Sequence, residues 1–105
     1  MNLYTDKNLI GKWIIDPQDI ESINKYGRTS LEFSIDGRLI YTIHSNNREQ
    51  IILLNYRTQE GKLITNQPSA PREEITIYEL QSNKKLILVW GGHKSTYIRQ
   101  DGMTL

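Results

Sequence analysis

Short segments of alternating apolar and polar residues, separated by turn signals, constrain the fold of this chain more than any other sequence feature. Residues 31–35 alternate as a half-buried strand should, Asp36 and Gly37 form a strong hairpin signal, and residues 39–44 return as the next strand. The turns arrive at intervals of roughly 10 residues, which is typical of a β-sandwich or a β-barrel. The expected strands cover residues 10–15, 31–35, 39–44, 50–57, 62–65, 74–80, 86–90 and 93–99.

These eight strands predict an all-β fold, an eight-stranded antiparallel up-and-down barrel. Tight turns join sequential strands in antiparallel fashion, and eight is a natural number for closing a small barrel. An open β-sandwich of the same strands is the alternative. Residues 51–54 are four aliphatics in a row, which suggests a strand buried on both faces. The length of 105 residues leaves room for one domain, which we expect to span residues 1–105.

Residues 16–27 interrupt the strand pattern with the signals of one short helix. Asp16 is a good N-cap, Pro17 suits the first helical position, and Gly27 can end the helix with a positive φ. We expect this helix after the first strand to lie over one end of the barrel. There it is either a plug that completes the core, which we favour, or a lid on a pocket.

Charge and composition exclude several classes of protein. The chain has 13 basic and 12 acidic residues scattered along its length, without the basic stripe that nucleic-acid binding requires. Its longest apolar runs are about four residues, far below the ~20 that a membrane span needs. It has no cysteine, which excludes disulfides and thiolate metal sites. The polar start lacks a signal-peptide pattern, so we expect a cytoplasmic protein unless the sequence was trimmed from an exported precursor.

Gly11 and Trp13 lie on the same face of the first expected strand, because side chains alternate along a strand. The glycine leaves room for another group to lie beside the indole ring. Arg99, in the last expected strand, is a plausible partner through a cation–π contact worth ~0.5–2 kcal/mol. If the first and last strands are neighbours, this contact would close a barrel.

Gly11-Lys12-Trp13, the helix at residues 16–26 and Arg99 together resemble the lipocalin-like barrels of the calycin superfamily, especially short bacterial lipocalin-like domains. In these barrels a glycine-x-tryptophan motif lies on the first strand, and an arginine of the last strand packs across the tryptophan. The resemblance implies a pocket for a small apolar molecule and a structural role for Gly11, Trp13 and Arg99. It does not imply an enzyme, and we expect no enzymatic activity. This chain departs from larger members in being too short for their C-terminal helix and in having no disulfide, which suggests a narrower barrel.

Aromatic residues of the expected strands are the candidates for a ligand-binding site. The chain has two tryptophans and six tyrosines but only one phenylalanine. Tyr41, Tyr56, Tyr78 and Trp90 could offer rings and hydroxyls to a ligand. The alternative, which we favour, is that these rings fill the interior, because an eight-stranded barrel is just wide enough for its own side chains.

Catalytic and metal-binding patterns are weak. His44 and His93 are the only histidines, and each lies at an expected strand end without a metal-ligand pattern beside it, so we expect no metal and no cofactor. A trio of His93, Ser95 and Asp101 lacks a nucleophile-elbow signature, and we therefore expect no catalytic residue.

Glu73 and Glu74 are adjacent acidic residues at the start of an expected strand. Because neighbouring strand residues point to opposite faces, the two carboxyl groups cannot work together as an acid–base pair. We expect Glu74 and Glu79 to be solvent-facing or rim charges.

Two classes of function remain open. The first is a small binding protein that holds an apolar or aromatic ligand in its barrel. The second is a protein-interaction module, such as an inhibitor or immunity-type protein, with a filled barrel. This module would act through the helix at residues 16–26 and through residues 66–72, whose prolines indicate a loop or broken edge. A solvent-connected cavity of ~300 Å³ or more would favour the first class, and a filled barrel with an exposed apolar patch the second.

Overall fold

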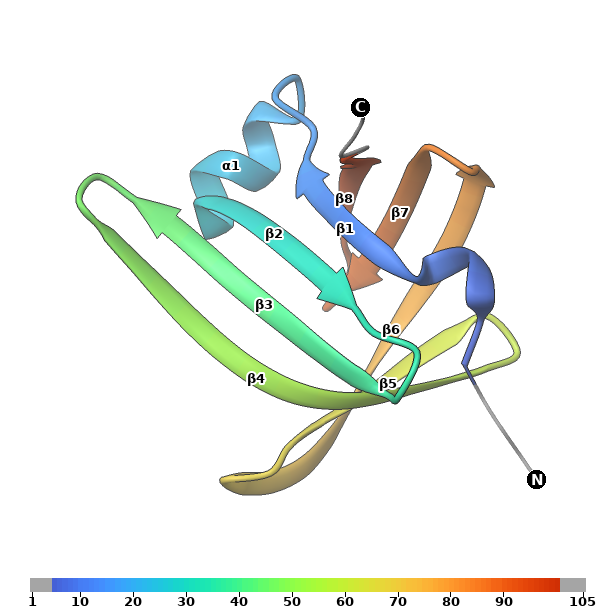
Figure 1. The fold of residues 1–105 in the computed structure, drawn as a ribbon. Helices are drawn as coiled ribbons and strands as arrows, with labels where there is room; N and C mark the ends of the chain where they lie inside the picture. The colour runs from blue at the N-terminus through green and yellow to red at the C-terminus, as the bar shows by residue number, and fades with distance from the viewer. Residues whose placement is uncertain (1–4, 101–105) are drawn as a thin grey trace.

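Eight antiparallel strands close a barrel in sequence order within residues 5–100, which the computed structural model describes (Figure 1). The fold class predicted from the sequence is confirmed. The open sandwich is excluded, because the last strand pairs with the first. The strands are β1 Gly11–Ile15, β2 Arg28–Phe33, β3 Arg38–Ser45, β4 Arg48–Gln59, β5 Lys62–Gln67, β6 Ala70–Ser82, β7 Lys85–Trp90 and β8 His93–Arg99.

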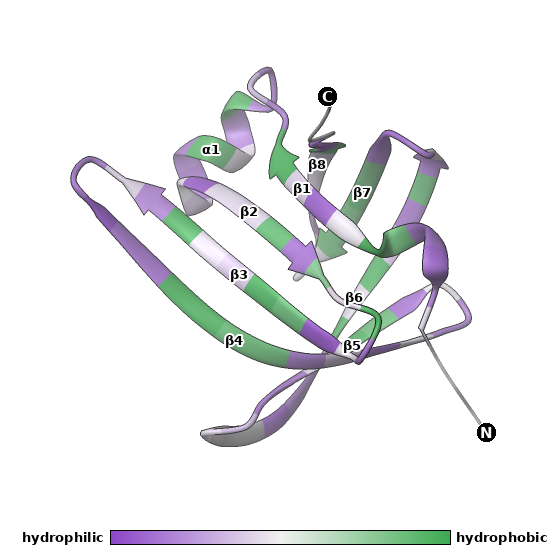
Figure 2. Ribbon diagram, in the orientation of Figure 1, coloured by the Kyte–Doolittle hydropathy of each residue, from purple (hydrophilic) through white to green (hydrophobic). Residues whose placement is uncertain are grey.

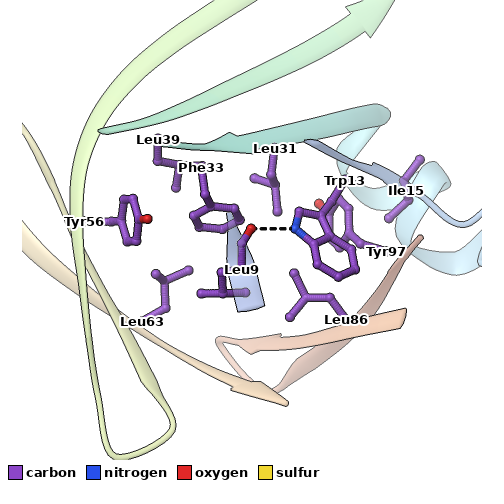
Figure 3. Close-up of a cluster of buried hydrophobic side chains, with 10 residues drawn as sticks. All are labelled: Leu9, Trp13, Ile15, Leu31, Phe33, Leu39, Tyr56, Leu63, Leu86 and Tyr97. Carbon is purple, nitrogen blue, oxygen red and sulfur yellow. Dashed lines mark hydrogen bonds between the residues drawn. The ribbon is translucent and has the colours of Figure 1, made fainter. Parts of the chain in front are cut away.

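The core is a cluster of inward-facing side chains from most strands of the barrel (Figure 3). Trp13 and Phe33 are almost completely buried, and the ring of Phe33 meets that of Tyr56 edge to face at 5.0 Å between centroids. The indole N–H of Trp13 donates to the carbonyl of Leu9, 2.9 Å away, so burial leaves that donor satisfied. The buried cluster comprises Leu9, Trp13, Ile15, Leu31, Phe33, Leu39, Tyr56, Leu63, Leu86 and Tyr97.

Arg99 covers Trp13 as the sequence predicts. Its guanidinium carbon lies 4.2 Å from the centre of the indole ring. Gly11 has a φ of 121°, and a Cβ atom there would lie 2.9 Å from an Arg99 nitrogen. The glycine is therefore needed both for its backbone conformation and for the close approach of the arginine.

Helix α1, Ile20–Tyr26, is shorter than predicted and begins later. Its N-cap is Asp19, whose carboxylate accepts a hydrogen bond from the Ser22 N–H, whereas the Asp16 carboxylate accepts from the Gln18 N–H in the preceding turn. The predicted start at Asp16 and Pro17 is wrong, because both aspartates can cap and the later one is used. The predicted end at Gly27 is confirmed, with a φ of 87°. Within residues 5–100, no helix is long and apolar enough to cross a membrane.

The region predicted as a loop over residues 66–72 is mostly strand. β5 continues to Gln67 and β6 begins at Ala70, so only Pro68 and Ser69 form the turn. The pairing shifts register between Asn66 and Gln67, which gives the irregularity that the prolines indicate without ending the ladder.

The apolar middle of β4 is buried on one face only. Ile51 and Leu53 are 57% and 61% exposed on the outside of the barrel, whereas Leu54 packs against the core cluster. Figure 2 shows this run as a hydrophobic band along β4. The prediction of burial on both faces is wrong, because each strand of a closed barrel has one face toward the interior and the other toward the outside.

Candidate ligand-binding cavity

A cavity of about 370 Å³ lies inside the barrel. This volume falls within the usual range of small-molecule sites, which begins at ~300 Å³. The cavity reaches solvent beside Trp90 and Glu74, since Trp90 is 47% exposed and the Glu74 side chain is 41% exposed. Its lining, drawn from α1 and from β2 to β8, consists of Tyr26, Leu31, Leu39, Tyr41, Leu54, Leu63, Thr65, Glu74, Thr76, Leu88, Trp90, His93, Ser95 and Tyr97.

The floor of the cavity is part of the hydrophobic core. Leu31, Leu39, Leu63 and Tyr97 both line the cavity and belong to the buried cluster. The Trp13 ring belongs to the cluster but not to the lining. The barrel is therefore filled by its own side chains in one part and hollow in another, and the hollow part is mainly apolar.

The four aromatic residues that the sequence offers as ligand-binding candidates fall into two pairs. Tyr41 and Trp90 line the cavity. Tyr56 and Tyr78 do not line it: Tyr56 belongs to the core cluster, and Tyr78 packs against that cluster. The structure thus brings half of the candidates to the cavity, and their binding of a ligand stays a prediction.

The hydroxyl groups of Tyr56 and Tyr78 already have partners outside the cavity. Tyr56 donates to the carbonyl of Ser34 at 2.7 Å, and Tyr78 donates to the carboxylate of Asp6 at 2.7 Å. Burial raises the pKa of Tyr56 to about 12. Burial, together with the hydrogen bond to Asp6, raises the pKa of Tyr78 to about 12 as well. Both tyrosines are therefore held as neutral, hydrogen-bonded members of the barrel wall.

Three rings and one carboxylate form the rim of the cavity. Tyr26, at the end of α1, has its ring centroid 6.1 Å from Trp90 and 5.4 Å from His93. The indole N–H of Trp90 donates to the Glu74 carboxylate at 3.3 Å. The other Glu74 oxygen lies 3.3 Å from a guanidinium nitrogen of Arg72, a highly exposed side chain. The rim is therefore aromatic, with one acidic group oriented by the indole.

A hydroxyl network ties α1 to β8 beside the rim. The Ser22 hydroxyl lies 2.9 Å from His93 Nε2 and 2.9 Å from the Ser95 hydroxyl. Ser22 is fully buried, so its hydroxyl fixes the helix to the barrel wall. The trio of His93, Ser95 and Asp101 is not assembled among the described residues, since the serine bonded to His93 is Ser22 and Asp101 lies outside them.

Asp19 strengthens the same attachment of helix to barrel. Its carboxylate accepts hydrogen bonds from the N–H groups of Ser22 in α1 and Thr96 in β8. Burial by itself would raise the pKa of Asp19, but these hydrogen bonds and the nearby His93 lower it below its usual value.

Deeper in the cavity, the Tyr97 hydroxyl is bonded to the Thr29 hydroxyl at 2.7 Å. Burial raises the pKa of Tyr97 and, together with Tyr26, that of Tyr41. Both phenols are therefore neutral at physiological pH, and Tyr41 can act as a hydrogen-bonding group toward a ligand.

His44 lies apart from the cavity. Its ring is hydrogen-bonded to the Ser30 hydroxyl at 3.2 Å and to the Glu49 carboxylate at 3.0 Å, near the end of the β3–β4 hairpin. Within residues 5–100, no group of three or more His, Cys, Asp or Glu side chains is arranged to hold a metal ion.

Sequence reasoning missed Tyr26 and His93 as cavity residues, whereas Glu74, expected to be a solvent-facing or rim charge, lies at the rim. Alternation along β6 places Glu74 on the same face as Thr76, and this signal could have identified it as a cavity residue. Tyr26 had no such signal, because its position depends on where α1 ends and on how the helix docks against β8.

No protein-family model, no curated protein and no solved structure matches this chain.

Proposed function

We propose that this protein is a small lipocalin-like binding protein of the calycin type, which holds a small apolar or aromatic ligand in its barrel. The observation that carries the proposal is the solvent-connected cavity of about 370 Å³. The up-and-down order of eight strands, the helix after β1 and the stacking of Arg99 on Trp13 support the lipocalin-like assignment. A cytoplasmic location stays a prediction from the sequence.

The chemistry of the lining supports an apolar ligand with a small polar end. Leucines surround the inner part of the cavity, and polar groups are confined to a few positions such as Thr65, Thr76 and Ser95. A mainly apolar wall with a few placed polar groups is the usual composition of a small-molecule site.

Octanol is a suitable first probe, because it combines an alkyl chain with one neutral polar group. Leu54→Trp would place an indole in the cavity, whereas Leu53→Trp would make the same change at the neighbouring, outward-facing position. In NMR titrations we expect wild type and Leu53→Trp to bind octanol with shifts at cavity residues. Leu54→Trp should bind at least about tenfold more weakly, since the indole would occupy space that the ligand fills and reduce their apolar contact area.

Native mass spectrometry of the purified protein complements this titration. A stoichiometric small molecule released on denaturation would give the chemical class of the ligand. The proposal fails if nothing is released and octanol gives no saturable shifts in the wild-type protein. It also fails if Leu53→Trp and Leu54→Trp weaken octanol binding equally.

A protein-interaction module is the second candidate, and the outer surface gives an observation in its favour. Ile51 and Leu53 of β4 and Ile75 and Ile77 of β6 are each more than half exposed. Contiguous exposed apolar groups mark interaction sites, and the exposed Leu53 pairs across the sheet with Ile40 of β3, which is also exposed. If this function is correct, the protein should retain a partner in pull-down experiments, and Ile51→Asp with Leu53→Asp should lose that partner without losing octanol binding.

A further inference from the structure

We propose that the ligand carries an amine, held as an ammonium ion at the rim by Glu74 and by the rings of Trp90 and Tyr26. This inference rests on the proposed binding function and adds the charge of the ligand. Its first support is the charge of the lining. Among the described residues that line the cavity, Glu74 is the only acidic one, and none is lysine or arginine.

The second support is the arrangement of rings around that carboxylate. The Trp90 indole donates to one Glu74 oxygen at 3.3 Å, and Tyr26 lies 6.1 Å from the indole with the two ring planes at 54°. Faces of tryptophan and tyrosine attract cations, and several such rings beside a carboxylate form a site for organic ammonium groups. The indole presents its N–H edge to Glu74, and the Lys25 ammonium lies 5.8 Å from the centre of the Tyr26 ring, so a ligand ammonium would bind the carboxylate and reach a ring face beside these groups.

The third support is that a cation already occupies one side of Glu74. A guanidinium nitrogen of Arg72 lies 3.3 Å from the carboxylate oxygen that the indole does not use. The Arg72 side chain is 81% exposed and does not line the cavity. Exposed ion pairs contribute little stability, so an ammonium entering from the cavity can displace this guanidinium at small cost.

An anionic head group fits the same rim less well. Its negative charge would face the Glu74 carboxylate, and the Nε2 atom of His93 is already hydrogen-bonded to Ser22. Like charges brought together in a partly buried site repel each other, so the rim discriminates against carboxylates as well as favouring amines.

The test compares octylammonium, octanol and octanoate, which share one alkyl chain and differ in the head group. Calorimetric titration of the wild-type protein near neutral pH should give the order octylammonium, octanol, octanoate from tightest to weakest. We expect octylammonium to bind about tenfold more tightly than octanol, as a charge-assisted hydrogen bond replaces a neutral one.

Glu74→Gln and Glu73→Gln form a matched pair of variants. Glu73 is adjacent on β6 but pairs with Arg57 away from the cavity, so both changes remove one negative charge from the same strand. Glu74→Gln should abolish the preference for octylammonium over octanol, and Glu73→Gln should keep it. Arg72→Ala removes the competing guanidinium and should strengthen octylammonium binding about threefold while leaving octanol unchanged.

The outcomes separate the two proposals. If octanol binds but octylammonium binds no more tightly, or if octanoate binds best, the ammonium site is wrong and the apolar binding function stands. Equal effects of Glu74→Gln and Glu73→Gln would also overturn the ammonium site, because the preference would then reflect net charge. If none of the three probes binds to the wild-type protein, the binding function itself fails.

Discussion

Arg99 and Trp13 face each other across the pair of strands that closes the barrel, with the guanidinium carbon 4.2 Å from the indole centre. The guanidinium also donates to the carbonyls of Asn8 and Ile10 at 2.5 and 2.7 Å, on the segment that leads into β1. Its Nε–H donates to the carbonyl of Asn83, in the turn before β7, at 2.6 Å. One side chain therefore links three segments of the barrel.

Trp13→Ala should destabilise the protein by about 3–5 kcal/mol, because it removes a fully buried aromatic ring and leaves a cavity under Arg99. Trp90→Ala is the control, since the same truncation at a half-exposed rim position should cost about 1 kcal/mol. The measurement is the free energy of unfolding from chemical denaturation. A loss below ~1 kcal/mol for Trp13→Ala would show that the indole does not hold the core together.

Gly11→Ala should destabilise the protein by about 2–4 kcal/mol, because the new Cβ atom meets Arg99 at a backbone conformation that alanine disfavours. Gly91→Ala is the control without a steric contact: Gly91 has a positive φ of 59°, which alanine tolerates better than 121°, and it faces open space. We expect about 1 kcal/mol for Gly91→Ala from the backbone effect alone. Equal losses for the two variants in denaturation experiments would contradict a steric contact between Gly11 and Arg99.

Alkaline pH should destabilise the protein partly through Tyr78. Its pKa is raised by burial and by the hydrogen bond to Asp6 to about 12, whereas in the unfolded chain it is about 10. The stabilisation from neutral Tyr78 is therefore complete below about pH 10 and is lost as the pH rises toward 12. Tyr78→Phe should flatten the fall of Tm over this range. An unchanged pH profile in the variant would exclude Tyr78 as a cause of alkaline unfolding.

Acidic pH should weaken the attachment of α1 through Asp19. Although burial opposes ionisation, the backbone hydrogen bonds lower its pKa below the usual value of about 4. The stabilisation from the ionised Asp19 carboxylate is therefore present above about pH 4 and is lost as the pH falls through the lowered pKa. Asp19→Asn should remove this part of the acid dependence of Tm, whereas Glu21→Gln, on the exposed side of α1, should retain it. Parallel acid profiles for wild type and Asp19→Asn would contradict this role.

The strand order and the Gly11–Trp13–Arg99 arrangement could be predicted from the sequence, because alternation, turn residues and strand neighbours are local or pairwise signals. The start of α1 could not, since Asp16 and Asp19 are equally suited to a cap. One difference between the two aspartates comes from the tertiary structure, because the Asp19 carboxylate also accepts a hydrogen bond from the Thr96 N–H in β8.

Only two of the four ligand-binding residues predicted from the sequence, Tyr41 and Trp90, line the cavity. Alternation indicates which tyrosines face inward, but it does not give their height in the barrel. Tyr41 lies at the cavity and Tyr56 in the packed core because of the stagger between neighbouring strands, which depends on the whole sheet. The rim residue Tyr26 comes from the helix, and its position depends on docking that no local pattern encodes.

The closure of β8 onto β1 also determines when the barrel can be completed during synthesis. Arg99 and its carbonyl partner Ile10 are separated by 89 residues, so the closing contacts form only after all the strands from β1 to β8 have left the ribosome. Until then β1 is paired only with β2, its other edge has no partner, and Arg99 does not yet cover Trp13. A nascent chain stalled before β8 should therefore be the species most in need of a chaperone.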